Sequence, residues 1–187
     1  AGKSWKYGNN DQWGTTVSTI FEYSQGGRFS YTYGGDINGD GSGLNDLIYV
    51  PTADEISQMN FSGGGMGSAY DAFISQDDYL SGRRGQYAER YGALSPWKGR
   101  WDVRLLQDYH LEVRGKRNTI QLSLDVLNIG NLLNSEWGLV QQPNAVQPIG
   151  VSVENGEPTY TFDPDLTETF GYDASLLSRW QMQFGLR

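Results

Sequence analysis

Side-chain character alternates with a period of two residues along four long stretches of this chain, and this alternation most constrains its fold. In residues 13–23 the odd positions hold aromatic, valine or threonine side chains, and the even positions are mostly small or polar. Residues 100–113, 119–126 and 175–187 repeat the pattern. Because successive side chains of a strand point to opposite faces, the pattern predicts long β-strands with one apolar and one polar face.

Short turn sequences separate some of these stretches. SQGG at residues 24–27 is typical of a hairpin turn, so residues 29–33 are expected to return as a strand beside residues 13–23. RGKRN at residues 114–118 turns the chain between the next two strands. The expected fold is an all-β antiparallel meander of about five strands of roughly 9–14 residues, against a mean of about 5–6 in globular proteins.

Two long connections, residues 35–99 and 132–174, alternate with the short turns. TADEISQM and SAYDAFISQDDYL predict short helices in the first connection, and each opens with a capping-box pattern, Thr52 with Glu55 and Ser68 with Asp71. Aromatic side chains in this connection could contact a substrate, but packing within the loop itself is favoured for them: Tyr70, Phe73, Tyr79, Tyr87 and Tyr91.

Two architectures fit this pattern. A soluble antiparallel sheet packs one face on a core and exposes the other to water. A transmembrane barrel uses tilted strands of about 9–11 residues, short turns at one rim, long loops at the other, and aromatic girdles. The strand lengths and the alternation of connections favour the barrel, and the girdle candidates are Trp97, Trp101, Trp137, Trp180, Tyr31 and Tyr33.

A barrel assigns each alternating position to lipid or to the lumen. The residues expected to face lipid are Val17, Phe21, Leu105, Leu111, Leu122, Leu124, Trp180, Met182 and Phe184. The residues expected to face the lumen are Ser18, Glu22, Arg104, Asp108, Gln121, Ser123, Asp125, Arg179 and Gln181.

Composition excludes several functional classes. The net charge of −8 argues against a nucleic-acid partner, which requires a basic surface. Without cysteine the chain has no disulfide and no thiol chemistry. It contains no apolar run of the roughly 18 residues that a transmembrane helix needs. The opening AGKSWKYG lacks the apolar segment of a signal peptide, so an export signal would lie upstream.

Several longer motifs resemble a known family. They are FSYTYGGDINGDGSGLNDLIYVP from Phe29, DDYLSGRRGQYAERYGALSPWKGRWDVRLLQDY from Asp77, QLSLDVLNIGNLLNSEWG from Gln121, and the final stretch SLLSRWQMQFGLR. Together they resemble the C-terminal part of Bacteroidetes-type TonB-dependent outer-membrane receptors, of the SusC-like and Oar-like groups. The resemblance runs in order over nearly the whole chain.

The resemblance implies that residues 1–187 are a single C-terminal segment of a barrel of about 22 strands. The plug, the TonB box and most of the wall would lie outside this sequence, and the natural C-terminus would follow a few residues after Arg187. The implied function is non-enzymatic import of a glycan, peptide or chelate across the outer membrane of a Gram-negative cell, with the long loops extracellular. The implied partners are the rest of the barrel and plug, TonB, outer-membrane lipid and a SusD-like surface lipoprotein. A surface adhesion barrel and a soluble calcium-dependent β-rich binding module remain alternatives.

One motif has the spacing of a cation-binding loop. DINGDGSGLND at residues 36–46 matches the first half of an EF-hand calcium loop, although Leu47 stands where that loop has its bidentate glutamate. A calcium site here would use Asp36, Asn38, Asp40, Ser42 and Asp46. The alternative is an acidic turn in which aspartate side chains bind nearby backbone amides.

Nothing in the chain predicts catalysis. His110 is the only histidine, so a Ser/His/Asp triad or a paired-histidine metal site has little to build on. The charged residues near it occupy the polar face of a strand, where ion pairing explains them more simply than acid/base chemistry: Asp102, Arg104, Asp108, Glu112 and Arg114.

Overall fold

The computed structural model describes all of residues 1–187 and is mostly β, with 45% strand and 16% helix. The chain divides into two compact units. The sheet unit comprises Ala1–Ser24, Trp97–Val140 and Tyr172–Arg187, and the loop unit comprises Gln25–Pro96 and Gln141–Gly171. None of the helices has the length and apolar character needed to cross a membrane.

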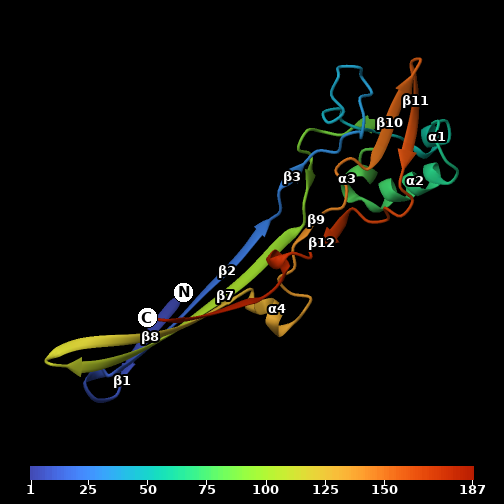
Figure 1. Cartoon of the computed structure of the whole chain (residues 1–187). Helices are drawn as coiled ribbons and strands as arrows, with labels where there is room; N and C mark the ends of the chain where they lie inside the picture. Colours follow the sequence, from blue (N-terminus) through green and yellow to red (C-terminus); the bar gives the residue numbers. More distant parts are fainter. The chain divides into compact units, whose positions relative to one another are not determined.

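The sheet unit is built on one antiparallel sheet of five strands (Figure 1). In spatial order these are β1 (Gly2–Tyr7), β2 (Trp13–Gln25), β7 (Trp97–Val113), β8 (Lys116–Leu127) and β13 (Gln181–Leu186). A short turn with the 3-10 helix η1 (Asn9–Asp11) joins β1 to β2. Arg114 and Gly115, both with positive φ, form the two-residue turn between β7 and β8, as a type I′ hairpin requires. The expected alternation of short and long connections is therefore present.

Cross-strand register confirms that the sheet has an apolar and a polar face. Leu124 of β8 lies opposite Leu105 of β7 and Phe184 of β13. The next position, Asp125, lies opposite Arg104 and Gln183. Because side chains alternate along every strand, this register places apolar side chains together on one face and polar side chains on the other.

The predicted hairpin at residues 24–27 is wrong. Gly26 and Gly27 lack the positive φ of a hairpin turn, and they pair with another segment, through Gly26 N to Pro96 O at 3.0 Å and Ser95 N to Gly27 O at 2.9 Å. A Cβ at Gly26 would lie 2.7 Å from Pro96 O, so glycine serves this close approach. The chain continues into β3 (Arg28–Phe29), which pairs with β6 (Ala93–Leu94), and residues 30–33 add no strand to the five-stranded sheet. The fifth strand is instead β1.

The last stretch is also shorter as a strand than predicted. The Ser175 side chain accepts a hydrogen bond from Leu177 N at 3.2 Å and caps the 3-10 helix η2 (Leu176–Ser178). Ser178 Oγ then accepts one from Val140 N at 2.9 Å. These hydrogen bonds replace strand pairing, so residues 176–180 are not part of β13.

The loop unit contains four pairs of short strands and three of the four α-helices. Its strand pairs are β3 with β6, β4 (Tyr49–Val50) with β5 (Gln86–Tyr87), β10 (Ile149–Glu154) with β11 (Glu157–Phe162), and β9 (Gln141–Pro143) with β12 (Phe170–Tyr172). Its helices are α1 (Ala53–Ile56), α2 (Met66–Gln76) and α3 (Asp78–Ser81), whereas α4 (Ile129–Leu133) belongs to the sheet unit.

Local capping explains where the helices begin. The capping box of Thr52 and Glu55 is confirmed at α1, with Thr52 N donating to Glu55 Oε2 at 2.8 Å. The box predicted for Ser68 and Asp71 is wrong, because α2 begins earlier, after Gly65 with φ 81°. Ser68 lies inside the helix and donates to Gly65 O at 2.8 Å.

The hydrophobic core lies entirely within the loop unit. Its members come from both long connections: Tyr31, Tyr33, Ile48, Val50, Ile56, Tyr70, Phe73, Ile74, Leu80, Ala88, Ala93, Ile149, Val151 and Phe162. Backbone bonds join the connections, including Gly34 N to Ile149 O at 2.9 Å and Val151 N to Gly34 O at 3.1 Å. Tyr31 and Tyr33 are 0% and 4% exposed, so their assignment to an aromatic girdle is wrong. In the sheet unit, Val126 is the only buried large apolar side chain.

Candidate functional site

The apolar face of the five-stranded sheet is an extended, uncovered surface. Phe21 is 70% exposed, Leu122 55% and Phe184 74%. Leu105, Leu122, Leu124, Phe184 and Leu186 also line a shallow groove of about 470 Å³ on this face. Contiguous apolar surface of this kind marks a site of contact with a protein, a ligand or a membrane.

Aromatic pairs lie toward both ends of this apolar face. Near the short turns, Trp13 packs on Tyr109 with ring centroids 4.7 Å apart. Near the long connections, Tyr23 stacks on Trp97 at 5.0 Å. Gly99 lies close to the Tyr23 ring, since a Cβ at this position would be 3.2 Å from it.

Polar atoms of these aromatic clusters are hydrogen-bonded within the face. Trp101 Nε1 donates to Thr19 Oγ1 at 2.6 Å. The Tyr7 hydroxyl donates to Gln107 Oε1 at 3.3 Å, and Thr15 Oγ1 donates to the same oxygen at 2.7 Å. Trp137 and Trp180, also predicted as girdle residues, lie outside the five strands and are 54% and 44% exposed. The contribution of Tyr7 was missed because β1 was not predicted.

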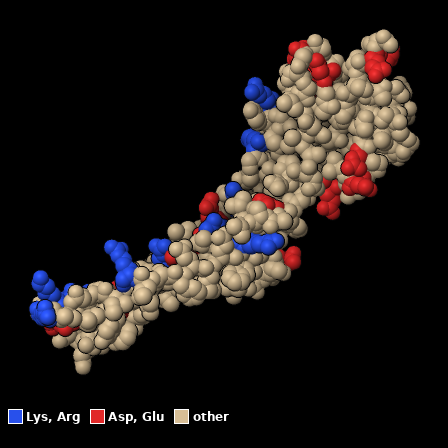
Figure 2. Space-filling model, viewed as in Figure 1, with Lys and Arg blue, Asp and Glu red and all other residues tan.

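The polar face carries paired rather than isolated groups. Arg104 forms an ion pair with Asp125 across β7 and β8. Gln121 Nε2 donates to Asp108 Oδ1 at 2.8 Å. His110 Nδ1 lies 2.8 Å from Thr119 Oγ1, as a cross-strand polar pair. Lys and Arg side chains also gather at the short-turn end of the sheet (Figure 2), where they include Arg114, Lys116 and Arg117.

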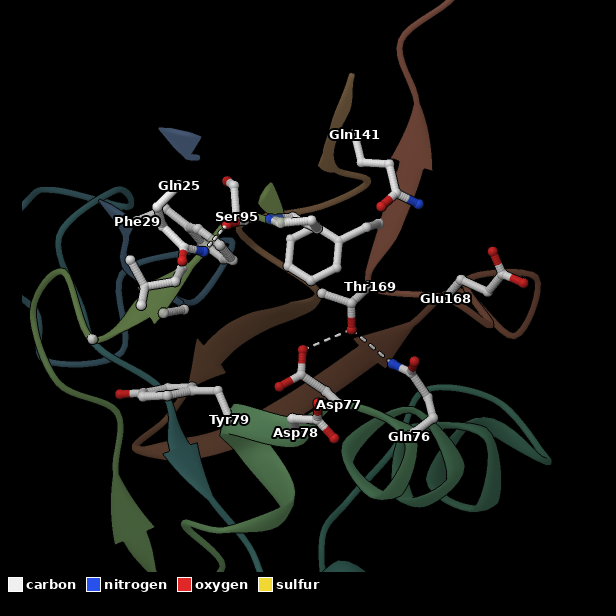
Figure 3. Close-up of a pocket in the computed structure, with 15 residues that line it drawn as sticks. Gln25, Phe29, Gln76, Asp77, Asp78, Tyr79, Ser95, Gln141, Glu168 and Thr169 are labelled. Atoms are coloured by element: carbon white, nitrogen blue, oxygen red, sulfur yellow. Dashed lines mark hydrogen bonds between the residues drawn. The ribbon is translucent and has the colours of Figure 1, made fainter. Parts of the chain in front are cut away.

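A cavity of about 740 Å³ lies within the loop unit (Figure 3). Residues from both long connections line it, and sequence reasoning missed it because no motif links them. Its lining includes Gln25, Phe29, Asp77, Asp78, Gln141, Glu168, Thr169 and Phe170. Figure 3 shows Asp78 near Tyr79, and Gln141 and Glu168 in another part of the lining.

Asp77 fixes one wall of this cavity. The side chain is 4% exposed, and its Oδ2 accepts hydrogen bonds from the hydroxyls of Tyr31 at 2.7 Å and Thr169 at 2.6 Å. Its Oδ1 caps α3 by accepting from Leu80 N at 2.7 Å. Burial, and secondarily the bond to Asp77, raises the pKa of Tyr31 well above its ordinary value. Tyr31 therefore stays a neutral donor, and the wall is preorganised.

The predicted calcium loop uses its carboxylates on its own amides. Asp36 accepts from Gly39 N at 2.7 Å and Gly41 N at 2.7 Å, and Asp46 accepts from Ile37 N at 2.9 Å. Asp40 accepts from Ser42 N and from the side chain of Asn45, and these bonds, the Asn45 bond foremost, lower the pKa of Asp40.

The side-chain amide of Asn38 points its Nδ2 toward Asp40 and Asp46. Nowhere does the chain bring three histidine or carboxylate side chains together as a metal site. Calcium binding by Asp36, Asn38, Asp40, Ser42 and Asp46 therefore stays a prediction.

Comparison with known proteins yields no relative: no protein-family model, curated protein or solved structure matches the chain.

Proposed function

We propose that the five-stranded sheet is part of the wall of a transmembrane β-barrel, with its apolar face against lipid and its polar face toward the lumen. The observation that carries this proposal is the placement of the core. A soluble sheet buries one face, whereas here the buried apolar side chains lie in the loop unit and the apolar face of the sheet is uncovered. Lipid would supply the missing cover.

The dimensions of the apolar face support the same conclusion. The aromatic pairs are separated by ten residues along β2, from Trp13 to Tyr23, and Trp101 and Tyr109 are eight residues apart along β7. At about 3.3 Å per residue these spans are roughly 26–33 Å. Strands tilted by about 35–45° would reduce this to a height near the 25 Å apolar band of outer-membrane barrels, which aromatic girdles flank.

The strand edges fit a sheet that continues. β1 and β13 each have a partner on one side only, and barrels satisfy such edges by pairing every strand. We therefore propose further strands of the same barrel as the first partners of this sheet, up to about 22 strands by the resemblance.

The biological role follows from the resemblance of the motifs to TonB-dependent receptors. The proposed role is non-enzymatic import of a nutrient across the outer membrane, with the two long connections extracellular and a plug and TonB coupling the import to energy. A SusD-like lipoprotein would be a surface partner. The compact loop unit supports a binding role for the connections, because its shared core holds a preformed cavity.

Single-cysteine labelling tests the membrane assignment, because the natural chain has no cysteine. Leu124→Cys and Ser123→Cys are adjacent in β8 but lie on opposite faces. In outer membranes, a small water-soluble maleimide should label Ser123→Cys through the lumen and leave Leu124→Cys unlabelled until detergent or urea is added. Equal labelling of both positions in the intact membrane would contradict the proposal.

Import itself requires a second measurement. Cells carrying the full receptor should lose substrate accumulation when TonB is deleted, while surface binding of the substrate continues. Accumulation that is unchanged without TonB would contradict energised import, and binding with no accumulation in either strain would favour the adhesion alternative.

A further inference from the structure

The loop unit has a strong excess of negative charge. It holds fourteen aspartate and glutamate side chains and four arginines, which gives a formal net charge of −10. The sheet unit holds the other eight acidic and ten basic side chains, a net charge of +2. The acidity of the whole chain therefore comes from the loop unit, and a ligand that binds there meets a negative potential.

The four arginines of the loop unit do not neutralise this cavity. Arg84 pairs with Asp71 at 2.6 Å and Arg83 with Glu89 at 2.7 Å. Arg28 donates to Tyr91 O, and Arg90 lies over the Tyr91 ring. None of the four is among the residues that line the cavity.

The cavity has three carboxylates and no cation. Asp77 is 4% exposed and hydrogen-bonded only to neutral donors, so its charge is unpaired within the protein. Asp78 and Glu168 are solvent-exposed, line the same cavity, and form no ion pair. The lining includes no lysine, arginine or histidine. An anionic ligand would be repelled, and a cation would be attracted at the depth of the buried charge.

Aromatic and amide groups complete the lining. The rings of Phe29 and Phe170 meet edge to face at 6.1 Å and supply apolar surface with a negative ring face. Gln25 Nε2 donates to Ser95 O at 2.7 Å, which leaves its carbonyl oxygen as an acceptor. Tyr79 is not available in the same way, because Arg83 lies over its ring at 5.1 Å.

We infer that this cavity binds an organic cation, an ammonium or guanidinium group on an apolar stem such as a lysine or arginine side chain. The stem would pack on Phe29 and Phe170. The cationic head would lie in the combined negative field of Asp77, Asp78 and Glu168, which line different parts of the cavity. As a cargo site this inference rests on the proposed function, but binding itself does not require import.

Calorimetric titration of the full chain with N-acetyl-arginine amide tests the inference, with N-acetyl-citrulline amide as a neutral probe of the same shape. The matched variants are Asp78→Asn with Glu168→Gln in the cavity, and Glu154→Gln with Glu157→Gln on the β10–β11 hairpin of the same unit. Both variants remove two negative charges. The cavity variant should bind the arginine probe at least about tenfold more weakly, and the hairpin variant should bind like the natural chain.

Three results would overturn the inference: no saturable binding of the arginine probe, equal binding of the citrulline probe, or equal weakening by both variants. The last result would mean that only the overall charge attracts the probe. A failure of the membrane proposal would appear in the cysteine labelling and leave this titration unchanged.

Discussion

Two buried tyrosines of the loop unit differ in whether their hydroxyl has a partner. The Tyr31 hydroxyl donates to Asp77, whereas the Tyr70 hydroxyl is buried with no hydrogen-bond partner. A buried hydroxyl without a partner costs about 1–3 kcal/mol, and a bond to a charged acceptor contributes about 1.5–3 kcal/mol. Two chemically identical substitutions should therefore have opposite effects.

Tyr70→Phe should stabilise the loop unit by about 1 kcal/mol, because the ring keeps its packing on Phe162 and loses only the unpaired hydroxyl. Tyr31→Phe should destabilise it by about 2 kcal/mol, because Asp77 loses a donor. Urea unfolding followed by near-ultraviolet circular dichroism of tyrosine measures both. Equal losses of stability in the two variants would contradict the assigned hydrogen bonding.

Ionisation of the buried Tyr33 should lower the stability of the loop unit at alkaline pH. Burial raises the pKa of Tyr33 to about 12 from 10.0. A raised pKa means that the folded state holds the phenol proton more tightly than the unfolded chain. The stabilisation is fully present below pH 10 and is lost as pH rises from 10 to about 12.

The expected loss from this group is about 1.4 kcal/mol per pH unit across that window. Tyr33→Phe should make the stability of the loop unit less steep with pH there. Tyr91→Phe is the control, because this ring is 54% exposed and does not contribute to the raised pKa of Tyr33. If the control changes the slope as much as Tyr33→Phe, the effect does not come from the burial of Tyr33.

At the scale of elements, the sequence predicted what depends on neighbours along the chain. Period-two alternation predicted β2, β7 and β8, and the capping box predicted α1. SQGG misled because a glycine pair permits a hairpin turn without requiring one, and here glycine serves a close approach to Pro96. The assignment of Tyr31 and Tyr33 to an aromatic girdle was wrong because alternation cannot distinguish apolar side chains that face lipid from apolar side chains that pack on other side chains.

The two faces of β8 give a matched pair of substitutions. Leu122 lies on the apolar face and Gln121 on the polar face. An arginine facing lipid at mid-depth costs about 2–4 kcal/mol, so Leu122→Arg should impair membrane assembly while Gln121→Arg has a milder effect. Quantifying the folded protein in outer membranes checks this. Equal yields of the two variants would contradict the assigned faces.

The loop at residues 36–46 gives a prediction for calcium. If it binds the ion, the missing bidentate glutamate should limit affinity to about 10⁻⁴–10⁻³ M, and millimolar calcium should protect the loop from protease. EDTA and Asp40→Ala should both remove that protection. A cleavage pattern that is identical with calcium, with EDTA and in the variant would identify the motif as an acidic turn only.

At the scale of the whole molecule, the sequence could not predict that two connections separated by a strand hairpin share one core. The cavity joins residues such as Asp77 and Thr169, which are 92 positions apart, through a direct hydrogen bond. Such contacts depend on long-range packing, which neither periodicity nor local motifs specify. The two units also differ in what stabilises them. The loop unit has its own hydrophobic core, whereas the sheet has an uncovered apolar face.

The two units should therefore depend differently on lipid. Transferring the full chain from detergent or lipid into buffer should remove amide hydrogen-exchange protection from β2, β7 and β8, because water cannot cover their apolar face. Amides of α2 and β10–β11 should keep most of their protection, because their packing partners are other side chains of the chain.

The aromatic residues provide an independent measurement of how the two units respond to removal of lipid. All six tryptophans belong to the sheet unit, and the loop unit contains none. Tryptophan emission should shift to the red on removal of lipid, and brominated acyl chains should quench it before that removal. The near-ultraviolet circular dichroism of tyrosine, dominated by the packed rings of the loop unit, should change much less. If amide protection and tryptophan emission of the sheet unit are the same in buffer and in lipid, the apolar face has another cover and does not belong to a membrane wall.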